Sequence, residues 1–351
     1  SSTLMFNDNV FNLELTPDRG DLLSYYGFAK DLSAITGGEF ILDLGKKIET
    51  DFVNQFQIKV DTNLAKVYSL TQAKVVVKPS PWFIQAELIK QGIEPKNNLV
   101  DISNYVMYLF GTPNHIFDAK QITGREIFIE SLGKDDEFFA LDGNKYKLKS
   151  SDLVIKDKEK VLALAGIIGS EDSKVTNETT DVIIENAIFD NALVFETQKR
   201  LSLKTEASDR FSKGVTLELF QKGYVCLIEL LKKYADAKIS NQVYKGVEKI
   251  NCHTFEFSLK KLKKIQSEII RILEEIKEKK YNFNTSELSI DKKMYFLVVG
   301  EYQKELKLLN EIISDIENNN YEKVNENNFI LKRQNLEIGD TIIKLTIKEE
   351  K

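Results

Sequence analysis

The chain has 351 residues, of which 42% are hydrophobic and 29% charged, and its formal net charge at pH 7 is -5. This length allows two or three domains with a substantial core, and the composition excludes a chain that is disordered throughout. The acidic balance excludes nucleic-acid binding over the whole surface, because such binding needs a positive balance, so any contact with a polyanion must be a local patch.

The first 45 residues predict a small packing module. The alternating apolar residues of FNLEL (11–15) indicate a strand, and TPDRGD supplies turn residues. Asp21 is a suitable N-cap for a helix, whose apolar residues recur every three or four positions. The glycine pair at 37–38 is expected to end that helix.

Residues 46–245 mix short strand-like stretches with helix-like ones. The expected strands include KVVVKP, EIFIE and DVIIENAIF, and the expected helices include PWFIQAELIKQG and LELFQKGYVCLIELLKKY. This mixture predicts an α+β domain with a mixed sheet instead of a repeating βαβ array.

From residue 246 to residue 351 the composition becomes rich in Lys, Glu and Asn, which indicates a further small α+β domain. LKKLKKIQSEIIRILEEIKEKK predicts an amphipathic helix that is solvated on one side and docked on the other. Its apolar face consists of Leu262, Ile265, Ile269, Leu273 and Ile276. MYFLVV, ELKLLNEIISDI, NFILKR and TIIKLTI complete the predicted domain.

The targeting and redox signals are sparse. The longest apolar run, VLALAGIIG, is about half the roughly 20 residues that a bilayer span needs. The start of the chain lacks the basic and apolar regions of a signal peptide, so we expect a cytoplasmic protein without membrane contact. Cys226 and Cys252, with two histidines, are too few and too scattered for a disulfide framework or a typical zinc site, so no metal is expected.

Glu185 is the most unusual charged residue of the sequence. In TTDVIIENAIF, Val182 and Ile184 share one face of the strand, whereas Ile183 and Glu185 share the other, so both faces are largely apolar. A carboxylate in a dry interior must be paired, hydrogen-bonded or protonated. Glu185 is therefore either an ion-paired or solvated structural residue, or part of a binding site.

His115, in GTPNHIFD, is a second ambiguous residue. An unperturbed imidazole can act as a general base near neutral pH, but a single histidine is also a common packed or surface residue. No nucleophile motif such as GxSxG accompanies it. The two interpretations remain open on this segment alone.

Two further segments allow both a structural and a functional interpretation. In LALAGIIGSE, Gly166 and Gly169 mark either a tight turn or a bare backbone wall that a ligand can approach. In TQKRLSLKTEASDRFSKG, the cationic side chains form either a solvated surface or a contact for a phosphate backbone. Thr205 lies between them, with a hydroxyl that can donate and accept. The candidate RNA contacts are Lys199, Arg200, Lys204 and Arg210.

Taken in order, four segments resemble the β subunit of bacterial phenylalanyl-tRNA synthetase, specifically its editing module. They are LELTPDRGDLLSYYGFAKDLSAITG, VDISNYVMYLFGTPNHIFDAKQI, LALAGIIGSEDSKVTNETTDVIIENAIF and RLSLKTEASDRFSKGV, within roughly residues 10 to 235. The likeness to the family's following helical module is faint over residues 246–351, so we expect a fragment or a reduced relative.

The resemblance implies hydrolysis of the ester that links tyrosine wrongly to the tRNA for phenylalanine. It implies catalytic positions at His115, Glu185 and Thr205, and substrate-binding positions at Gly169 and Ala207, with Gly166 beside them. Glu185 is then the expected acceptor for the phenol, and His115 with Thr205 would orient a water or the terminal ribose. A site that hydrogen-bonds a substrate hydroxyl discriminates strongly against the analogue that lacks it.

The implied partners are the tRNA for phenylalanine and the synthetase α subunit, with no DNA and no membrane. No cofactor is expected for this chain, because ATP and magnesium would serve only the complete synthetase. A second hypothesis is a non-catalytic structural module that holds the α subunit and tRNA.

Overall fold

The computed structural model describes residues 13–16, 19–36, 38–42, 48–60, 64–246, 251–257 and 263–271, a few residues between 306 and 314, and strands between 321 and 347. Contacts between residues group the chain into two units. One unit comprises Ser1–Phe28 and Leu42–Glu248, and the other comprises Ala29–Ile41 and Lys249–Lys351. The division of the chain into three domains, with boundaries after residues 45 and 245, stays a prediction.

The first unit contains two five-stranded sheets. One has the order β1-β4-β7-β8-β9, and its strands are Gln57–Val60 (β1), Glu126–Ser131 (β4), Leu153–Lys156 (β7), Val161–Leu164 (β8) and Ile168–Gly169 (β9). The other has the order β11-β2-β10-β3, with β12 also on β2, and its strands are Ala65–Lys74 (β2), Asn114–Asp118 (β3), Asp181–Phe189 (β10), Lys238–Ile239 (β11) and Val243–Gly246 (β12). Strands β5 (Asp136–Phe139) and β6 (Lys145–Leu148) form a hairpin. β1 and β4 are parallel and the other pairs of this unit are antiparallel, so the predicted α+β fold with a mixed sheet is confirmed.

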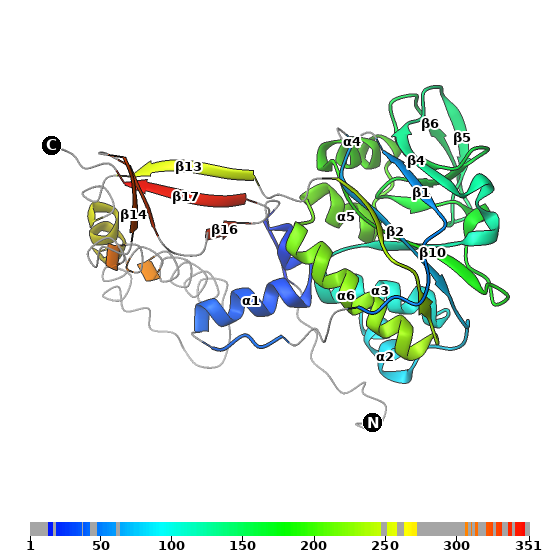
Figure 1. The fold of residues 1–351 in the computed structure, drawn as a ribbon, viewed down its shortest axis with the longest axis horizontal. Helices are drawn as coiled ribbons and strands as arrows, with labels where there is room; N and C mark the ends of the chain where they lie inside the picture. Colours follow the sequence, from blue (N-terminus) through cyan, green and yellow to red (C-terminus); the bar gives the residue numbers. More distant parts are fainter. Residues whose placement is uncertain are drawn as a thin grey trace, which may run out of the picture. The chain divides into compact units, whose positions relative to one another are not determined.

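Helices complete this unit, and two of them cover one face of the β2–β10 sheet. The α-helices are Trp82–Lys90 (α2), Asn98–Phe110 (α3), Asn191–Leu201 (α4), Glu206–Lys213 (α5) and Leu217–Tyr234 (α6); the short 3-10 helices are Gly20–Leu22 (η2), Ala119–Gln121 (η3), Thr123–Arg125 (η4) and Glu171–Ser173 (η5). Figure 1 shows α3 and α6 on the same side of β2 and β10. The Asn186 side chain of β10 donates to the Phe220 carbonyl of α6, and Thr71 of β2 is hydrogen-bonded to Tyr224.

The alternation of a strand assigns the remaining side chains to the opposite face. Asn186 and Ser69, which are paired in the register, face the helices, whereas Glu185 and its partner Leu70 face away from them. Tyr68, opposite Ala187, shares the face of Glu185. This face is turned toward the cavity described below.

Most predicted elements of this unit are confirmed. DVIIENAIF forms β10, EIFIE lies in β4, and the two predicted helices are α2 and α6. The strand predicted at KVVVKP is wrong, because β2 ends at Lys74 and Val76 is 50% exposed. The Val76 amide donates to the Ala235 carbonyl, so the chain has left the sheet there.

The structure corrects both elements predicted for the N-terminal segment, the strand at 11–15 and the helix capped by Asp21. Helix α1 spans Tyr25–Thr36, so it ends before the glycine pair as expected, but it does not begin at Asp21. Asp21 lies in η2 and pairs with Arg19 at 2.8 Å, while the Ser24 hydroxyl accepts the Gly27 amide at 3.0 Å. Residues 13–16 form no strand, and residues 11 and 12 lie outside the described residues.

The second unit contains a sheet with the order β13-β17-β15-β14, and β16 pairs with β17. Its strands are Asn251–Phe257 (β13), Tyr321–Asn325 (β14), Asn328–Leu331 (β15), Leu336–Ile338 (β16) and Thr341–Ile347 (β17). NFILKR and TIIKLTI, which the sequence assigns to a small α+β domain, contain strands β15 and β17. Residues 263–271 are helical, with Ile269 buried and Ile265 exposed. The remaining residues of the predicted apolar face, Leu262, Leu273 and Ile276, and the MYFLVV stretch lie outside the described residues.

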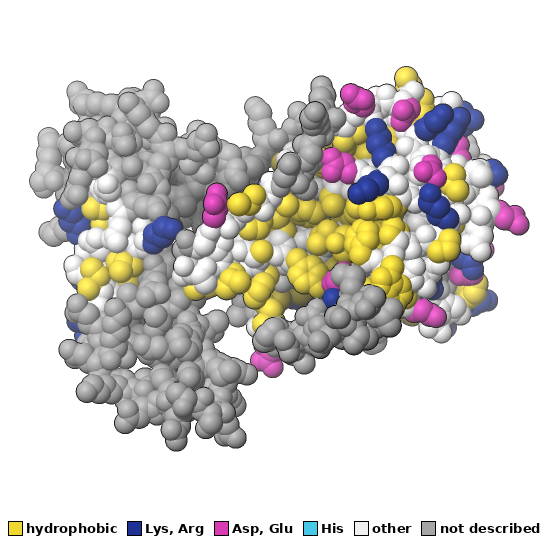
Figure 2. All heavy atoms as spheres, turned by 90° about the horizontal axis from the view of Figure 1, so that it is seen from below, with side chains coloured by type: hydrophobic (Ala, Val, Ile, Leu, Met, Phe, Trp, Pro, Cys, Tyr) yellow, Lys and Arg dark blue, Asp and Glu magenta, His cyan; other side chains and the backbone are white. Residues whose placement is uncertain are grey.

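Hydrophobic side chains gather on one face of the first unit, which is seen in Figure 2. Exposed large hydrophobic residues of the first unit include Tyr25 and Phe28 at the start of α1, and Trp82 and Ile89 of α2. The end of α2 and the start of α1 are in contact, because Gln91 Nε2 donates to Tyr25 Oη at 2.7 Å. Gathered apolar residues of this kind mark a surface suited to protein contact. Within the described part of the chain, no helix combines the length and the hydrophobicity that a membrane span requires.

Candidate functional site

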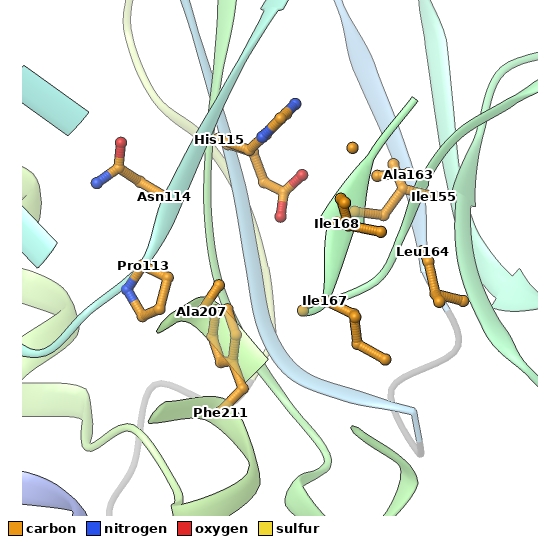
Figure 3. A pocket seen from close by; sticks show the side chains of 13 residues that line it. Pro113, Asn114, His115, Ile155, Ala163, Leu164, Ile167, Ile168, Ala207 and Phe211 are labelled. Carbon is orange, nitrogen blue, oxygen red and sulfur yellow. The ribbon is translucent and has the colours of Figure 1, made fainter. Parts of the chain in front are cut away.

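A cavity lies where the two sheets of the first unit face each other. The space inside it, including the solvent at its open mouth, is about 360 Å³. Its lining comes from both sheets and from α5: Pro113, Asn114, His115, Ile155, Ala163, Leu164, Gly166, Ile167, Ile168, Gly169, Glu185, Ala207 and Phe211. Figure 3 shows the aliphatic side chains of β7 to β9 across the cavity from His115, with Ala207 and Phe211 at one end.

Glu185 reaches the cavity from β10, the strand whose residues from Val182 to Phe189 are all buried. Only 5% of Glu185 is exposed, and its Oε2 atom is buried without a hydrogen-bond partner among the described residues. Burial raises the pKa of Glu185 to about 8, because the apolar surroundings disfavour the ionised form. At neutral pH Glu185 therefore holds its proton and offers both an O–H donor and an acceptor oxygen.

His115 lies directly opposite Glu185 in the β3–β10 register. The residue as a whole is half-buried, but its Nε2 atom is buried and lacks a partner within the described chain. Its ring stands edge-on to Phe117, with the ring centroids 4.5 Å apart. Burial lowers the pKa of His115 to about 4, so the imidazole is neutral at pH 7, and its Nε2 atom is available for a hydrogen bond with a ligand.

Gly169 leaves the space that the imidazole occupies. A Cβ atom at position 169 would lie 2.6 Å from His115 Cε1 and 2.8 Å from Nε2, which is closer than real contacts allow. The absence of a side chain at Gly169 therefore determines how far the His115 ring can enter the cavity.

Gly166 has a different role, which is to shape the turn between β8 and β9. Its φ of 71° lies in the left-handed region, and a Cβ atom there would lie 3.0 Å from Phe189 Cδ2 and 3.2 Å from Phe211 Cδ2. Both the backbone conformation and the tight packing favour glycine.

Replacing Gly166 by alanine is expected to lower the free energy of unfolding by about 1–3 kcal/mol, through backbone strain and overpacking against Phe189. Urea unfolding followed by circular dichroism measures this loss. Gly133→Ala is a matched control for backbone strain alone, because Gly133 also has a positive φ but has open space around it. An equal loss in both variants would contradict a packing role for Gly166.

Thr205 and Ala207 reach the site through the start of α5. Thr205 is the N-cap: its Oγ1 accepts the Ser208 amide at 3.0 Å and donates to the Ile167 carbonyl at 2.8 Å. Thr205 thus joins α5 to the cavity wall without lining the cavity, whereas Ala207 lines it. The hydroxyl both donates and accepts, and both functions are used within the fold.

The four basic candidates differ in their surroundings. Arg210 is 4% exposed and donates to the Leu23 carbonyl and to Glu206, so its guanidinium is held inside the fold, away from a phosphate. Arg200 is paired with the buried Asp152. Lys199 and Lys204 are exposed, and Lys204 lies 3.3 Å from Asp209.

The aliphatic wall and two aromatic residues of the site are absent from the residues predicted from the sequence. Phe211 lines the cavity from α5, and Tyr68 lies behind Glu185 on the same face of the sheet. The sequence does not show that aliphatic side chains of β7, β8 and β9 line a cavity, because the direction in which these strands face depends on long-range pairing. The alternation of YSLTQ in β2 is typical of a strand and would place Tyr68 on one of its faces. The sequence-based prediction instead places the strand at KVVVKP, which follows this segment.

Comparisons with known proteins show which sequences this chain is similar to. The family model described as the B3/4 domain matches residues 65–236. The phenylalanine–tRNA ligase beta subunit of Staphylococcus haemolyticus is 39% identical over 243 residues, which is 68% of this chain and 30% of that protein. The beta subunits of Staphylococcus saprophyticus and Staphylococcus aureus strain USA300 are 39% and 35% identical over 241 and 244 residues. The chain spans about 30% of the length of these curated relatives.

Proposed function

The chain contains a B3/4 domain and is a relative of phenylalanine–tRNA ligase β subunits, and on this premise we propose that it hydrolyses the ester of tyrosine mischarged on the tRNA for phenylalanine. The observation that carries the proposal is the Glu185 carboxyl, buried opposite an aliphatic wall of the cavity and without a partner for Oε2 in the described structure. The aliphatic wall suits a benzene ring, and Glu185 Oε2 suits its hydroxyl. His115 Nε2 and Asn114 Oδ1 are the other unpaired buried atoms of the described lining residues.

Discrimination between tyrosine and phenylalanine follows from the hydrogen bond that Glu185 can make. A tyrosine side chain supplies a phenol that hydrogen-bonds the carboxyl, whereas a phenylalanine side chain leaves the carboxyl unpaired. Sites that leave a buried polar group unpaired reject the wrong substrate strongly. The carboxyl is neutral at pH 7, so it can serve the phenol as donor as well as acceptor.

The hydrolytic step requires less from the protein than hydrolysis of an amide, because an aminoacyl ester is already activated. A positioned water and support for the developing oxyanion are the principal needs. His115, with a pKa of about 4, is a weak base, and its unpaired Nε2 is suited to a hydrogen bond with a water or a ribose hydroxyl. Its proposed role is therefore positioning, and Thr205 contributes by fixing the wall at Ile167.

The proposed partners follow from the same premise. The exposed Lys199 and Lys204, with Arg200 beside them, are proposed contacts for the tRNA backbone. Aminoacylation, with ATP and magnesium, is assigned to the complete synthetase and its α subunit, and a cytoplasmic location belongs to the same proposal.

A second candidate function is a structural module that holds the α subunit without catalysing hydrolysis. The exposed hydrophobic residues of α1 and α2 favour it, because they provide a surface for a protein partner (Figure 2). This function predicts a stable complex with the α subunit and no loss of fidelity when Glu185 is changed.

Deacylation of tyrosyl-tRNA for phenylalanine by the chain tests the proposal. Hydrolysis above the uncatalysed rate is expected, and His115→Ala is expected to lower kcat/KM about tenfold, because one positioning hydrogen bond is lost. His115→Gln keeps a hydrogen-bonding side chain and is expected to recover part of the rate. A wild-type rate equal to the uncatalysed rate, with intact binding of the α subunit, would instead support the structural function.

A further inference from the structure

Tyr68 is a buried tyrosine whose hydroxyl is unaccounted for. Its side chain is fully buried, and its Oη atom is one of the few buried polar atoms of the described residues that have no hydrogen-bond partner. Burying a hydroxyl without a partner is unfavourable, so such a group in a native core requires an explanation.

The β2–β10 register places this hydroxyl beside the cavity. Tyr68 is opposite Ala187, two residues from Glu185 on the same face of the sheet. Its ring packs against Phe189 at 6.2 Å between centroids, and Phe189 packs against Phe211 at 5.1 Å. Tyr68 does not line the cavity, whereas Glu185 and Phe211 do, so Tyr68 lies immediately behind the wall.

Glu185 and Tyr68 each change the pKa of the other. Burial raises the pKa of Tyr68 well above its usual value, and the Glu185 carboxyl raises it further. The Tyr68 hydroxyl in turn opposes the effect of burial on the pKa of Glu185. The two groups are thus neighbours, although neither Tyr68 Oη nor Glu185 Oε2 has a hydrogen-bond partner in the described structure.

We propose that Tyr68 is a positioning residue for substrate selection, whose hydroxyl donates to Glu185 and turns the carboxyl so that its other oxygen faces a phenol in the cavity. This inference rests on the proposed function. A neutral carboxyl has one carbonyl oxygen and one O–H group. A donor on the carbonyl oxygen leaves the O–H directed at the ligand, and phenylalanine leaves that O–H without a partner.

Tyr68→Phe tests the inference, because it removes the hydroxyl and keeps the ring. Tyr224→Phe is the matched control: Tyr224 is half-buried, and its hydroxyl is paired with Thr71 at 2.9 Å on the helix-covered face of the same sheet. Tyr68→Phe is expected to lower kcat/KM for tyrosyl-tRNA about tenfold and to leave the rate with phenylalanyl-tRNA unchanged. Tyr224→Phe is expected to change neither rate.

A second readout is independent of catalysis. The pKa of Glu185, followed by carbon NMR of labelled glutamate carboxyls, is expected to rise in Tyr68→Phe and not in Tyr224→Phe, since only the first loses the hydroxyl beside Glu185. Wild-type discrimination and an unchanged Glu185 pKa in Tyr68→Phe would overturn the inference and leave the proposed function intact. A wild-type chain without hydrolysis would overturn the proposed function, and the titration would still report whether Tyr68 holds the carboxyl.

Discussion

Glu185→Ala is expected to lower kcat/KM for tyrosyl-tRNA about 100-fold while leaving the slow hydrolysis of phenylalanyl-tRNA unchanged. The reason is that Glu185 presents a polar group with an unpaired oxygen to the cavity, so only a hydroxylated ring gains from its presence. Deacylation of both aminoacyl-tRNAs by the same preparation measures the change as a ratio, which cancels differences in active concentration.

Two further variants sharpen this test. Glu185→Gln keeps a neutral side chain of the same shape with donor and acceptor atoms, so at pH 7 it is expected to retain activity within about tenfold of the wild type. Gly169→Trp fills the cavity beside His115 and is expected to abolish hydrolysis. Full activity in Glu185→Ala, or equal losses with both substrates, would contradict selection of the phenol by Glu185.

The stability of the chain is expected to depend on Glu185 between pH 5 and pH 8. The pKa of this carboxyl is about 8 in the folded protein and 4.5 in its usual state. Between these values the folded state holds a proton that the unfolded state has released, so the contribution of Glu185 falls as pH rises, by about 1.4 kcal/mol per pH unit at most. The effect is present in full below pH 4.5 and is lost by pH 8.

Glu185→Gln removes this titration, so its stability relative to the wild type is expected to increase by a few kcal/mol from pH 5 to pH 8. His115 acts in the opposite direction at lower pH: its pKa is lowered to about 4, so stability rises with pH between about 4 and 6.5, equally in both proteins. Urea unfolding at pH 5, 6, 7 and 8 measures the difference.

The control for the pH experiment is Glu126→Gln. Glu126 is half-buried, and hydrogen bonds from Lys158 and Lys59 lower its pKa to about 2. It remains ionised throughout the range from pH 5 to pH 8, so its replacement is expected to change stability by the same amount at each pH. A similar constant difference for Glu185→Gln would show that Glu185 is ionised in the folded protein.

The sequence by itself determined the local elements and pointed to the unusual residues. Helical periodicity located α2 and α6, and a short apolar run located β10, where both strand faces, including that of Glu185, are largely apolar. These signals are local, because the periods of helices and strands are set by the geometry of the backbone. Local patterns also produced errors, since an apolar run such as KVVVKP does not reveal whether a strand partner exists.

Only the tertiary structure decided how those residues meet. Strand pairing across about seventy positions of sequence places Glu185 opposite His115, and the meeting of two sheets encloses them in one cavity with Gly169 and Ala207. Burial then shifts both pKa values, takes Arg210 away from solvent and brings Tyr68 behind the carboxyl. Pairing and burial are properties of the whole packed chain, so no short segment contains the information that sets them.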